Sequence, residues 1–313
     1  MHIIVIGIGG VGGYFGGRLA LTGHRVEFVA RGLHGKTIAA DGLKVKSVDG
    51  DFIAYPDQVH SSLETIEAPD LVLICTKSWQ LEAIGKELKS RINRDTVILP
   101  LQNGVSSVER LIKHVPEQQV LGGLCKIISK MEQPGVIDHF AFHPEIIFGE
   151  VDGSRSERTV RLEALFRSAK IDARISEDIR LDMWRKFLFI CVISGMGALC
   201  RQEIGVMRED AGIRELMERS AEEILEVAAH KGVGLTRNDM DRAFRAIDAQ
   251  EYHSTASLQR DMMDGKPSEI HDFNGYIVQE AARLGLSVPV NTFIYYTLRP
   301  MEEQAREKKG KSL

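Results

Sequence analysis

Cysteine is scarce in this sequence, and long apolar runs are missing. The chain has 313 residues, and its cysteines stand far apart at Cys75, Cys125, Cys191 and Cys200, without a CxxC pair. This spacing fits no metal-ligand set, and buried free thiols in a reducing cytoplasm are the simpler interpretation. No uninterrupted apolar segment approaches the ~20 residues that a membrane span needs. We therefore expect a cytoplasmic protein without a metal site.

An excess of charge of either sign is also missing. The formal net charge is −4, and 27% of the residues are charged. This balance gives no electrostatic reason to expect nucleic acid or an anionic membrane as a partner. The length is enough for roughly two domains with a substantial core.

The hydrophobic pattern changes near residue 176. Up to that point, short β-branched runs alternate with helical segments, which indicates right-handed βαβ units and a mostly parallel sheet. Residues 43–55 and 136–150 have two β-rich arms each and are predicted as hairpins. After Asp178 the apolar residues recur at helical spacing, and one helix is predicted from about Pro267 to Leu284.

These patterns together predict an α/β protein of two domains. Residues 1–176 would form a Rossmann-type, mostly parallel sheet domain, and residues 177–313 an all-helical domain. The cleft between two such domains is the default ligand site.

The segment "GIGGVG" follows the first predicted strand and opens a helix. Gly7 permits a tight turn, Gly9 lets a pyrophosphate approach the backbone, and Gly12 lets the helix pack closely on the strand. We predict dinucleotide binding by this loop, whose residues are Gly7, Ile8, Gly9, Gly10, Val11 and Gly12.

The end of the second strand predicts which nicotinamide cofactor is used. Enzymes that bind NAD usually place an acidic residue there to hold the ribose 2′-hydroxyl. In this chain the strand ends "FVARG", so Arg31 occupies that place, while Glu27 comes too early. Because a guanidinium suits a 2′-phosphate, we predict NADP(H).

Lys186 stands at the edge of an apolar stretch, with only Arg185 as basic company. One explanation is that the lysine stem lies on apolar surface while its charge stays in water. The other is that a partly desolvated ammonium serves as an acid.

Three polar stretches follow predicted core elements. "CTKSWQ" (75–80) and "LQNGV" (101–105) each come after a strand, at the carboxyl edge where such sheets bind ligands. "GKPSEIHDFNG" (265–275) would put Glu269 in the first turn of a helix, where the macrodipole favours an ionised carboxylate.

With these motifs in order, the sequence resembles the ketopantoate reductase (2-dehydropantoate 2-reductase) family along essentially its whole length. The resemblance is carried by "GIGGVGG", Arg31, "TKSWQ", "QNG", "WRKF", "SLQRDMMDGKPSEIHDFNG" and "GLSVPVNT". It implies a Rossmann domain and a helical domain, NADPH as cofactor, reduction of a 2-oxo acid to its 2-hydroxy acid, and a step in pantothenate biosynthesis.

The resemblance also implies roles for individual residues. Lys186 would be the general acid, and this makes catalysis the preferred explanation for its position. Asn103 and Lys77 would lie near the nicotinamide and the substrate carbonyl. Glu269 would contact substrate, cofactor and Lys186, and Ser257 would hold the substrate carboxylate.

Part of the expected polar lining is replaced in this chain. Well-matched relatives have asparagines four and eight positions after the lysine, where this sequence has Ile190 and Ser194. A further polar contact, often asparagine, appears as Ser254. Because isoleucine forms no hydrogen bond to a substrate hydroxyl, a bulkier or more apolar 2-oxo acid stays open beside ketopantoate.

Two other functions stay open. A β-hydroxyacid dehydrogenase relative would also use a lysine, but normally with asparagine one turn later, where Ile190 stands. A non-catalytic NADPH-binding sensor would have the same fold but no need for Lys186, Glu269 and Asn103. Helical domains of this kind often pack with a second copy, so a homodimer is one expected assembly.

Overall fold

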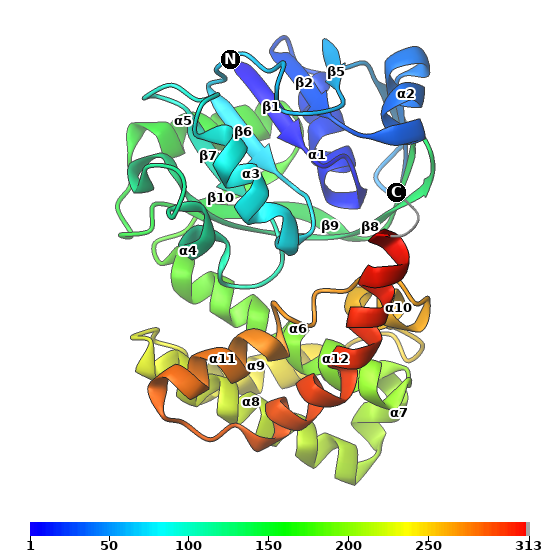
Figure 1. Cartoon of the computed structure of the whole chain (residues 1–313), viewed down its shortest axis with the longest axis vertical. Helices are drawn as coiled ribbons and strands as arrows, with labels where there is room; N and C mark the ends of the chain where they lie inside the picture. Colours follow the sequence, from blue (N-terminus) through cyan, green and yellow to red (C-terminus); the bar gives the residue numbers. More distant parts are fainter. Residues whose placement is uncertain (311–313) are drawn as a thin grey trace. The chain divides into compact units, whose positions relative to one another are not determined.

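The computed structural model describes residues 1–310 of the chain, which divide into two compact units (Figure 1). The first unit is Met1–Arg180, and the second begins at Leu181. The sequence pattern places the boundary after residue 176.

The first unit contains a five-stranded, wholly parallel sheet, which confirms the predicted Rossmann-type fold. Its strands are β1 (His2–Ile6), β2 (Arg25–Val29), β5 (Gln58–His60), β6 (Leu71–Ile74) and β7 (Val97–Pro100), in the spatial order β5-β2-β1-β6-β7. The connecting helices are α1 (Gly10–Ala20), α2 (Gly32–Asp41), η1 (Ser78–Gln80), α3 (Leu81–Leu88), α4 (Ser107–Leu111) and η2 (Glu117–Gln119). The strand order reverses at β1, and ligands bind outside the carboxyl ends at such a point.

A second sheet completes this unit. It contains β3 (Leu43–Ser47), β4 (Phe52–Ala54), β8 (Gly122–Gln133), β9 (Val136–Gly149) and β10 (Asp172–Ile175), accompanied by helix α5 (Glu157–Ser168). The predicted hairpin over 43–55 is confirmed by the antiparallel pair β3 and β4. The predicted hairpin within 136–150 is wrong, because that segment is one strand, β9, whose antiparallel partner is β8. The chain reverses at Gly135, where φ is +79°.

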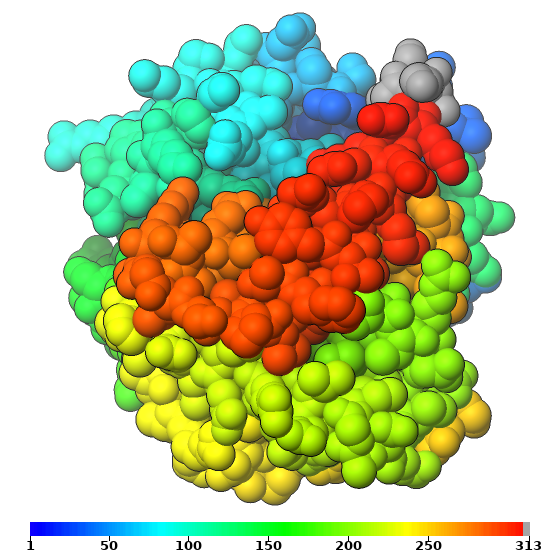
Figure 2. Space-filling model, turned by 60° about the horizontal axis from the view of Figure 1, so that its bottom comes forward, coloured from blue at the N-terminus to red at the C-terminus, as the bar shows by residue number. Residues whose placement is uncertain are grey.

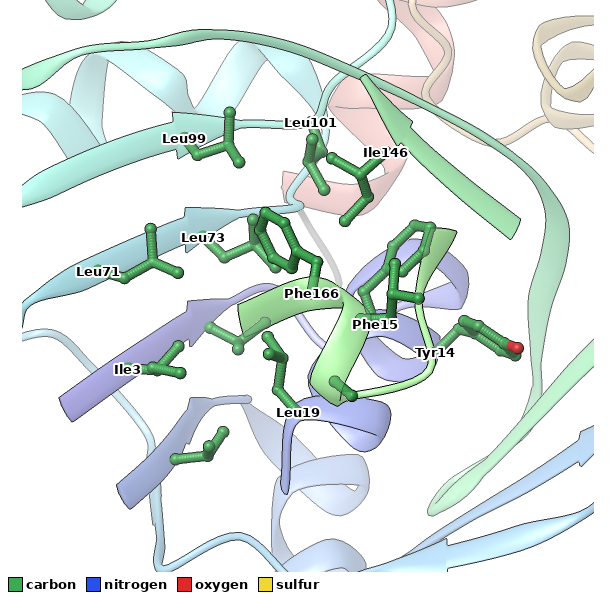
Figure 3. Packing of buried hydrophobic residues seen from close by; sticks show 14 of the residues in the cluster. Ile3, Tyr14, Phe15, Leu19, Leu71, Leu73, Leu99, Leu101, Ile146 and Phe166 are labelled. Atoms are coloured by element: carbon green, nitrogen blue, oxygen red, sulfur yellow. The ribbon is translucent and has the colours of Figure 1, made fainter. Parts of the chain in front are cut away.

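Helix α1 lies between the two sheets, and its small residues make this packing possible. A Cβ at Gly16 would lie 3.1 Å from Phe28 of the first sheet, and one at Gly13 would lie 2.5 Å from Ile137 of the second. Figure 3 shows Phe15 and Leu19 of α1 in one cluster of buried side chains with Ile3 of β1, Leu73 of β6 and Ile146 of β9. The opposite face of the parallel sheet is covered by α3 and α4.

The second unit is helical, as predicted. Its helices are α6 (Ile179–Cys200), α7 (Ile204–Glu209), α8 (Ala211–His230), α9 (Arg237–Asp248), α10 (Ser257–Met263), α11 (Asn274–Leu284) and α12 (Pro289–Gly310). Helix α9 begins with a capping box between Thr236 and Asp239. Helix α11 ends at Gly285 in the left-handed conformation.

Helix α6 is long and apolar enough to cross a membrane by length and composition alone, with a mean hydropathy of 1.4 over its most apolar window. Of that window, 67% is buried inside the fold. Its first turns carry charge at Arg180, Asp182, Arg185 and Lys186, so the uninterrupted apolar part begins only at Phe187. Burial on this scale is what a core helix requires.

The predicted helix from Pro267 to Leu284 is wrong at its start, because α11 begins at Asn274. Phe273 has φ −105° and ψ −101°, outside the helical region, so the turns before it do not continue into the helix. Glu269 therefore lies in a turn that precedes α11, and the macrodipole argument for its charge no longer applies.

Candidate active site

The glycine-rich loop between β1 and α1 has three positions without room for a side chain, Gly7, Gly10 and Gly12. Gly7 has φ +89°, and a Cβ there would lie 2.6 Å from Thr76 Cγ2. Its N–H donates to the carbonyl oxygen of Val29 at 3.1 Å, which joins the loop to β2. A Cβ at Gly12 would lie 2.1 Å from the Gly7 carbonyl oxygen, so the first turn of α1 packs directly on the loop.

Gly9 differs from these neighbours, because neither backbone conformation nor packing requires glycine there. It is the N-cap of α1 with φ −87°, and nothing lies within 4 Å of where its Cβ would be. A side chain would project into the space in front of the helix N-terminus, where backbone N–H groups attract anions. The structure thus leaves open space at Gly9.

A cavity of about 350 Å³ opens at this edge of the parallel sheet, beyond the carboxyl ends of β1, β2 and β6. Its lining includes Gly7, Ile8, Arg31, His34, Thr76 and Trp79. Arg31 is exposed and is the N-cap of α2. The structure thus brings Arg31 and the glycine loop to one cavity.

Glu27, the acidic residue of β2, is buried and bound by neighbouring side chains. It is 1% exposed, and its two carboxylate oxygens accept hydrogen bonds from His60 Nε2 at 2.8 Å and from Arg25 Nε at 2.7 Å. Burial alone would raise its pKa, but these two bonds leave the pKa of Glu27 below its ordinary value. With both oxygens engaged, Glu27 is not a ribose ligand.

His34 was not predicted from the sequence, where nothing distinguishes it from a surface residue of α2. Its Nδ1 accepts from the N–H of Gly135 at 2.9 Å, so Nε2 carries the proton and donates to the Ile8 carbonyl at 2.6 Å. Burial lowers the pKa of His34 more than the bond to Ile8 raises it. The neutral ring ties the glycine loop to the β8–β9 turn.

Lys77 and Asn103 lie at the same edge of the sheet, after neighbouring parallel strands. Lys77 follows β6, is half-buried, and has its Nζ 6.0 Å from the centre of the Trp79 ring. Asn103 follows β7, is also half-buried, and precedes Gly104, whose φ is +102°. Since β6 and β7 pair through Ile74 and Pro100, the chain leaves both strands at the same level.

In the second unit, Lys186 is half-buried near the start of α6. Its neighbour Arg185 has a structural task, because its Nε donates to the buried carboxylate of Asp239 at 2.8 Å. Burial would raise the pKa of Asp239, but the bonds from Thr236 and Arg185 hold it below the ordinary value. Arg185 is therefore an ion-pair partner within the second unit.

Two glycines of α6 let the segments that carry Ser257 and Glu269 pack against this helix. A Cβ at Gly197 would lie 2.5 Å from Gln259 Oε1 in α10, and one at Gly195 would lie 2.4 Å from Asn274 Oδ1 in α11. The rings of Phe187 and Phe273 meet edge-to-face at 6.0 Å. The residue after Lys186 thus contacts the turn that contains Glu269.

The remaining candidate residues differ in exposure. Glu269 is 5% exposed and Ser194 is 2% exposed, whereas Ser257 is exposed as the first residue of α10. Ser254 is half-buried, and its carbonyl accepts from the N–H of Ile204 at 3.0 Å. Ile190 is half-buried one turn after Lys186. Among residues 1–310, no group of three or more histidines, cysteines or acidic residues is arranged to hold a metal ion.

Two family models match the chain. The model described as "Ketopantoate reductase PanE/ApbA" matches residues 3–153, and its C-terminal counterpart matches residues 178–302. Among curated proteins, "Uncharacterized oxidoreductase YkpB" of Bacillus subtilis is 33% identical over 305 residues, covering 97% of this chain and all of that protein. A 2-dehydropantoate 2-reductase of Halobacterium salinarum is 27% identical over 93% of this chain and 95% of its own.

Solved structures give a similar result. A PanE/ApbA family ketopantoate reductase from Ralstonia eutropha superposes with a TM-score of 0.90 at 27% identity, over 98% of this chain and 100% of that one. A D-mandelate dehydrogenase in a ternary structure with NADH and anilino(oxo)acetate gives a TM-score of 0.89 at 21% identity, with the same coverage. At that identity the likeness shows the fold alone.

The loop geometry predicts opposite behaviour for two glycine substitutions. We expect Gly12→Ala to lower the free energy of unfolding by about 3 kcal/mol or more, because the new methyl group strikes the Gly7 carbonyl. Gly9→Ala, in open space at an N-cap, should lower it by no more than about 1 kcal/mol. Urea denaturation of both variants measures the difference, and equal losses would contradict this account of the loop.

Proposed function

Because this chain belongs to the ketopantoate reductase family, we propose that it is an NADPH-dependent reductase that converts a 2-oxo acid to the 2-hydroxy acid. The observation that carries the proposal is the cavity at the edge of the parallel sheet, with the glycine loop and Arg31 in its lining. The fit to a dinucleotide rests on Gly9, which leaves open space before the N-terminus of α1.

The choice of NADP(H) over NAD(H) is supported by the charges at the end of β2. Arg31 offers a guanidinium that can donate two parallel hydrogen bonds to a phosphate. Glu27, the one acidic residue of that strand, is occupied by Arg25 and His60. A 2′-phosphate would find a cation in this cavity lining, whereas a bare 2′-hydroxyl would find no carboxylate from β2.

We assign the proton-transfer role to Lys186. NADPH, when bound, supplies a hydride to the ketone carbon, and the carbonyl oxygen then needs a proton. The Lys186 ammonium donates a hydrogen bond that polarises the carbonyl and then gives this proton to the oxygen, so the carbonyl becomes a hydroxyl. A half-buried position suits this role, because a donor fixed in a partly dry environment stabilises developing charge better than one in water.

The other candidate residues would bind and orient the cofactor and the substrate. Asn103 and Lys77, at the ends of neighbouring strands, would serve both cofactor and substrate. Ser257, exposed at the start of α10, would hold the substrate carboxylate, and the nearly buried Glu269 would contact substrate, cofactor and Lys186.

Ile190 favours a second candidate substrate class. It lies one turn after Lys186, and its side chain is aliphatic. A hydroxyl-bearing substrate such as ketopantoate would bind better to an amide at this position, because an amide forms a hydrogen bond to the hydroxyl. Ser194 and Ser254 offer only short hydroxyl groups. A 2-oxo acid with a bulkier, more apolar side chain would pack better against Ile190. The D-mandelate dehydrogenase described above has the same fold.

A substrate panel tests the reaction and its specificity. Oxidation of NADPH, followed by its absorbance, would be measured with ketopantoate and with 2-oxo acids that carry larger aliphatic or aromatic side chains. Efficient turnover of ketopantoate would place the enzyme in pantothenate biosynthesis, and preference for the apolar acids would support the second class. Tight NADPH binding without turnover of any member would favour the non-catalytic sensor.

The setting of the reaction is also a proposal. We place the enzyme in the cytoplasm as a homodimer with a small-molecule substrate, and with neither nucleic acid nor membrane as a partner. Free thiols at all of its cysteines support a reducing compartment.

Replacement of Arg31 tests the cofactor assignment. Arg31→Ala should raise KM for NADPH about 10- to 100-fold, because charge-assisted hydrogen bonds to a phosphate are lost. KM for NADH should change little. Steady-state kinetics with both cofactors measure this, and equal effects on the two would remove Arg31 from 2′-phosphate recognition.

Replacement of Lys186 tests the acid. Lys186→Ala should lower kcat by roughly 10²- to 10⁴-fold while Kd for NADPH, measured by fluorescence, stays unchanged. Arg185→Ala is the matched control: it removes the same charge one residue earlier and should lower stability through Asp239 rather than kcat. Near-normal turnover by Lys186→Ala would exclude it from the mechanism.

A further inference from the structure

Helix α12 is fixed at its start by a buried carboxylate from another helix. Glu223 of α8, 8% exposed, accepts from the N–H groups of Val290 and Asn291 at 2.8 and 2.9 Å and from Asn291 Nδ2 at 2.7 Å. Asn291 in turn accepts from Asn274 Nδ2 of α11 at 2.9 Å. The first turn of α12 is therefore locked to α8 and α11, and Figure 2 shows α12 (red) running beside the orange segment that includes α11.

Farther along α12, two charged residues hold every polar group of Ser268. Glu302 Oε2 accepts from the Ser268 N–H and from its hydroxyl, both at 2.6 Å. Arg306 donates to the Ser268 carbonyl at 3.4 Å and, through Nε, to Glu302 Oε1 at 2.5 Å. We call Ser268, Glu302 and Arg306 the serine clamp.

The burial of the clamp argues for a positional task. Ser268 is 0% exposed and Glu302 is 1% exposed. Transferring a carboxylate into the interior costs free energy, and its hydrogen bonds offset only part of that cost. Apolar residues of similar volume therefore often stabilise a fold as well or better. What charge-assisted hydrogen bonds add is a fixed geometry.

Glu269, the residue after Ser268, is held from its other side as well. Its carbonyl accepts from the N–H groups of Asp272 and Phe273 at 2.9 and 3.1 Å. Pro267 restricts the backbone just before the clamp. The backbone of Glu269 is thus fixed at both ends, although the residue lies in a turn and not in a helix.

We propose that Glu302 is a positioning residue that sets the place of Glu269 through Ser268. The inference rests on the proposed function, in which Glu269 contacts substrate, cofactor and Lys186. Loosening the clamp would let the turn shift, and a misplacement of about 1 Å at a contacting group can lower turnover about 100-fold.

The experiment compares Glu302→Gln with a matched variant, Glu280→Gln. Glu280 is also a nearly buried carboxylate of the second unit, 7% exposed, and is paired with Lys231 and Arg283 at 2.6 and 2.5 Å. In Glu302→Gln, a neutral amide with only one acceptor oxygen replaces a carboxylate that accepts three bonds. We expect amide hydrogen exchange over residues 268–273 to rise at least 10-fold and kcat to fall about 10- to 100-fold. In Glu280→Gln both quantities should stay near the wild-type values.

Each outcome is decisive for the clamp. Unchanged exchange over 268–273 overturns the proposal whether or not a substrate is known, and faster exchange with an unchanged kcat overturns it too. Equal losses in both glutamine variants would reduce the clamp to a stability role. If Glu302→Gln fails to fold, Ser268→Ala removes the 2.6 Å hydroxyl bond to Glu302 together with the 3.4 Å bond that the hydroxyl accepts from the Ile270 N–H, and it should show changes in the same direction.

Glu269→Gln, measured in parallel, separates this inference from the proposed function. If Glu269→Gln keeps the wild-type kcat, the role assigned to Glu269 is wrong, and the positioning role proposed for Glu302 falls with it. If Glu269→Gln loses turnover while Glu302→Gln behaves like the control, only the clamp is wrong.

Discussion

Helix α1 passes between two β-sheets at distances that leave little room for a side chain at Gly13 and Gly16. Gly16 faces the parallel sheet and Gly13 faces the second sheet, so the helix axis is held close to both. Gly12 then brings the first turn onto the loop after β1, and Gly7 turns that loop toward β2. Because the helix is fixed on both sides, its N-terminus is held beside the point where the strand order reverses. Core packing therefore fixes the position of the helix N-terminus, the end that attracts anions.

The charge at this edge of the sheet depends on which charged residues are bound in the interior. Glu27 is drawn inward by Arg25 and His60, and its lowered pKa keeps it ionised as their partner. Arg31, at the start of α2, stays exposed in the cavity lining. His34 is held neutral by burial and works through hydrogen bonds instead of charge. The cofactor preference proposed for this chain thus depends on two residues: Glu27, whose carboxylate is bound by Arg25 and His60, and Arg31, whose guanidinium stays exposed.

Sequence patterns predicted the parts of the fold that follow from local periodicity. The parallel sheet and the all-helical second half are both confirmed. The partner of β9 was missed because the β-rich residues within 136–150 were interpreted as two arms, whereas β9 is one strand whose partner β8 comes just before the turn at Gly135. The helix start at Asn274 was missed for a related reason. Ser268 finds its partner in Glu302, 34 positions away, and no window around residue 268 contains that information.

The helical unit uses buried charge in a consistent way. Glu223, Asp239 and Glu302 each accept a backbone N–H at a chain turn or helix start. Each also accepts a hydrogen bond from a side chain elsewhere in the unit, which comes from Asn291, Arg185 and Ser268 respectively. Arg185 belongs to this scaffold through Asp239, whereas Lys186, the next residue, begins the apolar face of α6 beside Phe187. The scaffold explains Arg185, and proton transfer to a carbonyl oxygen is the role that we propose for Lys186.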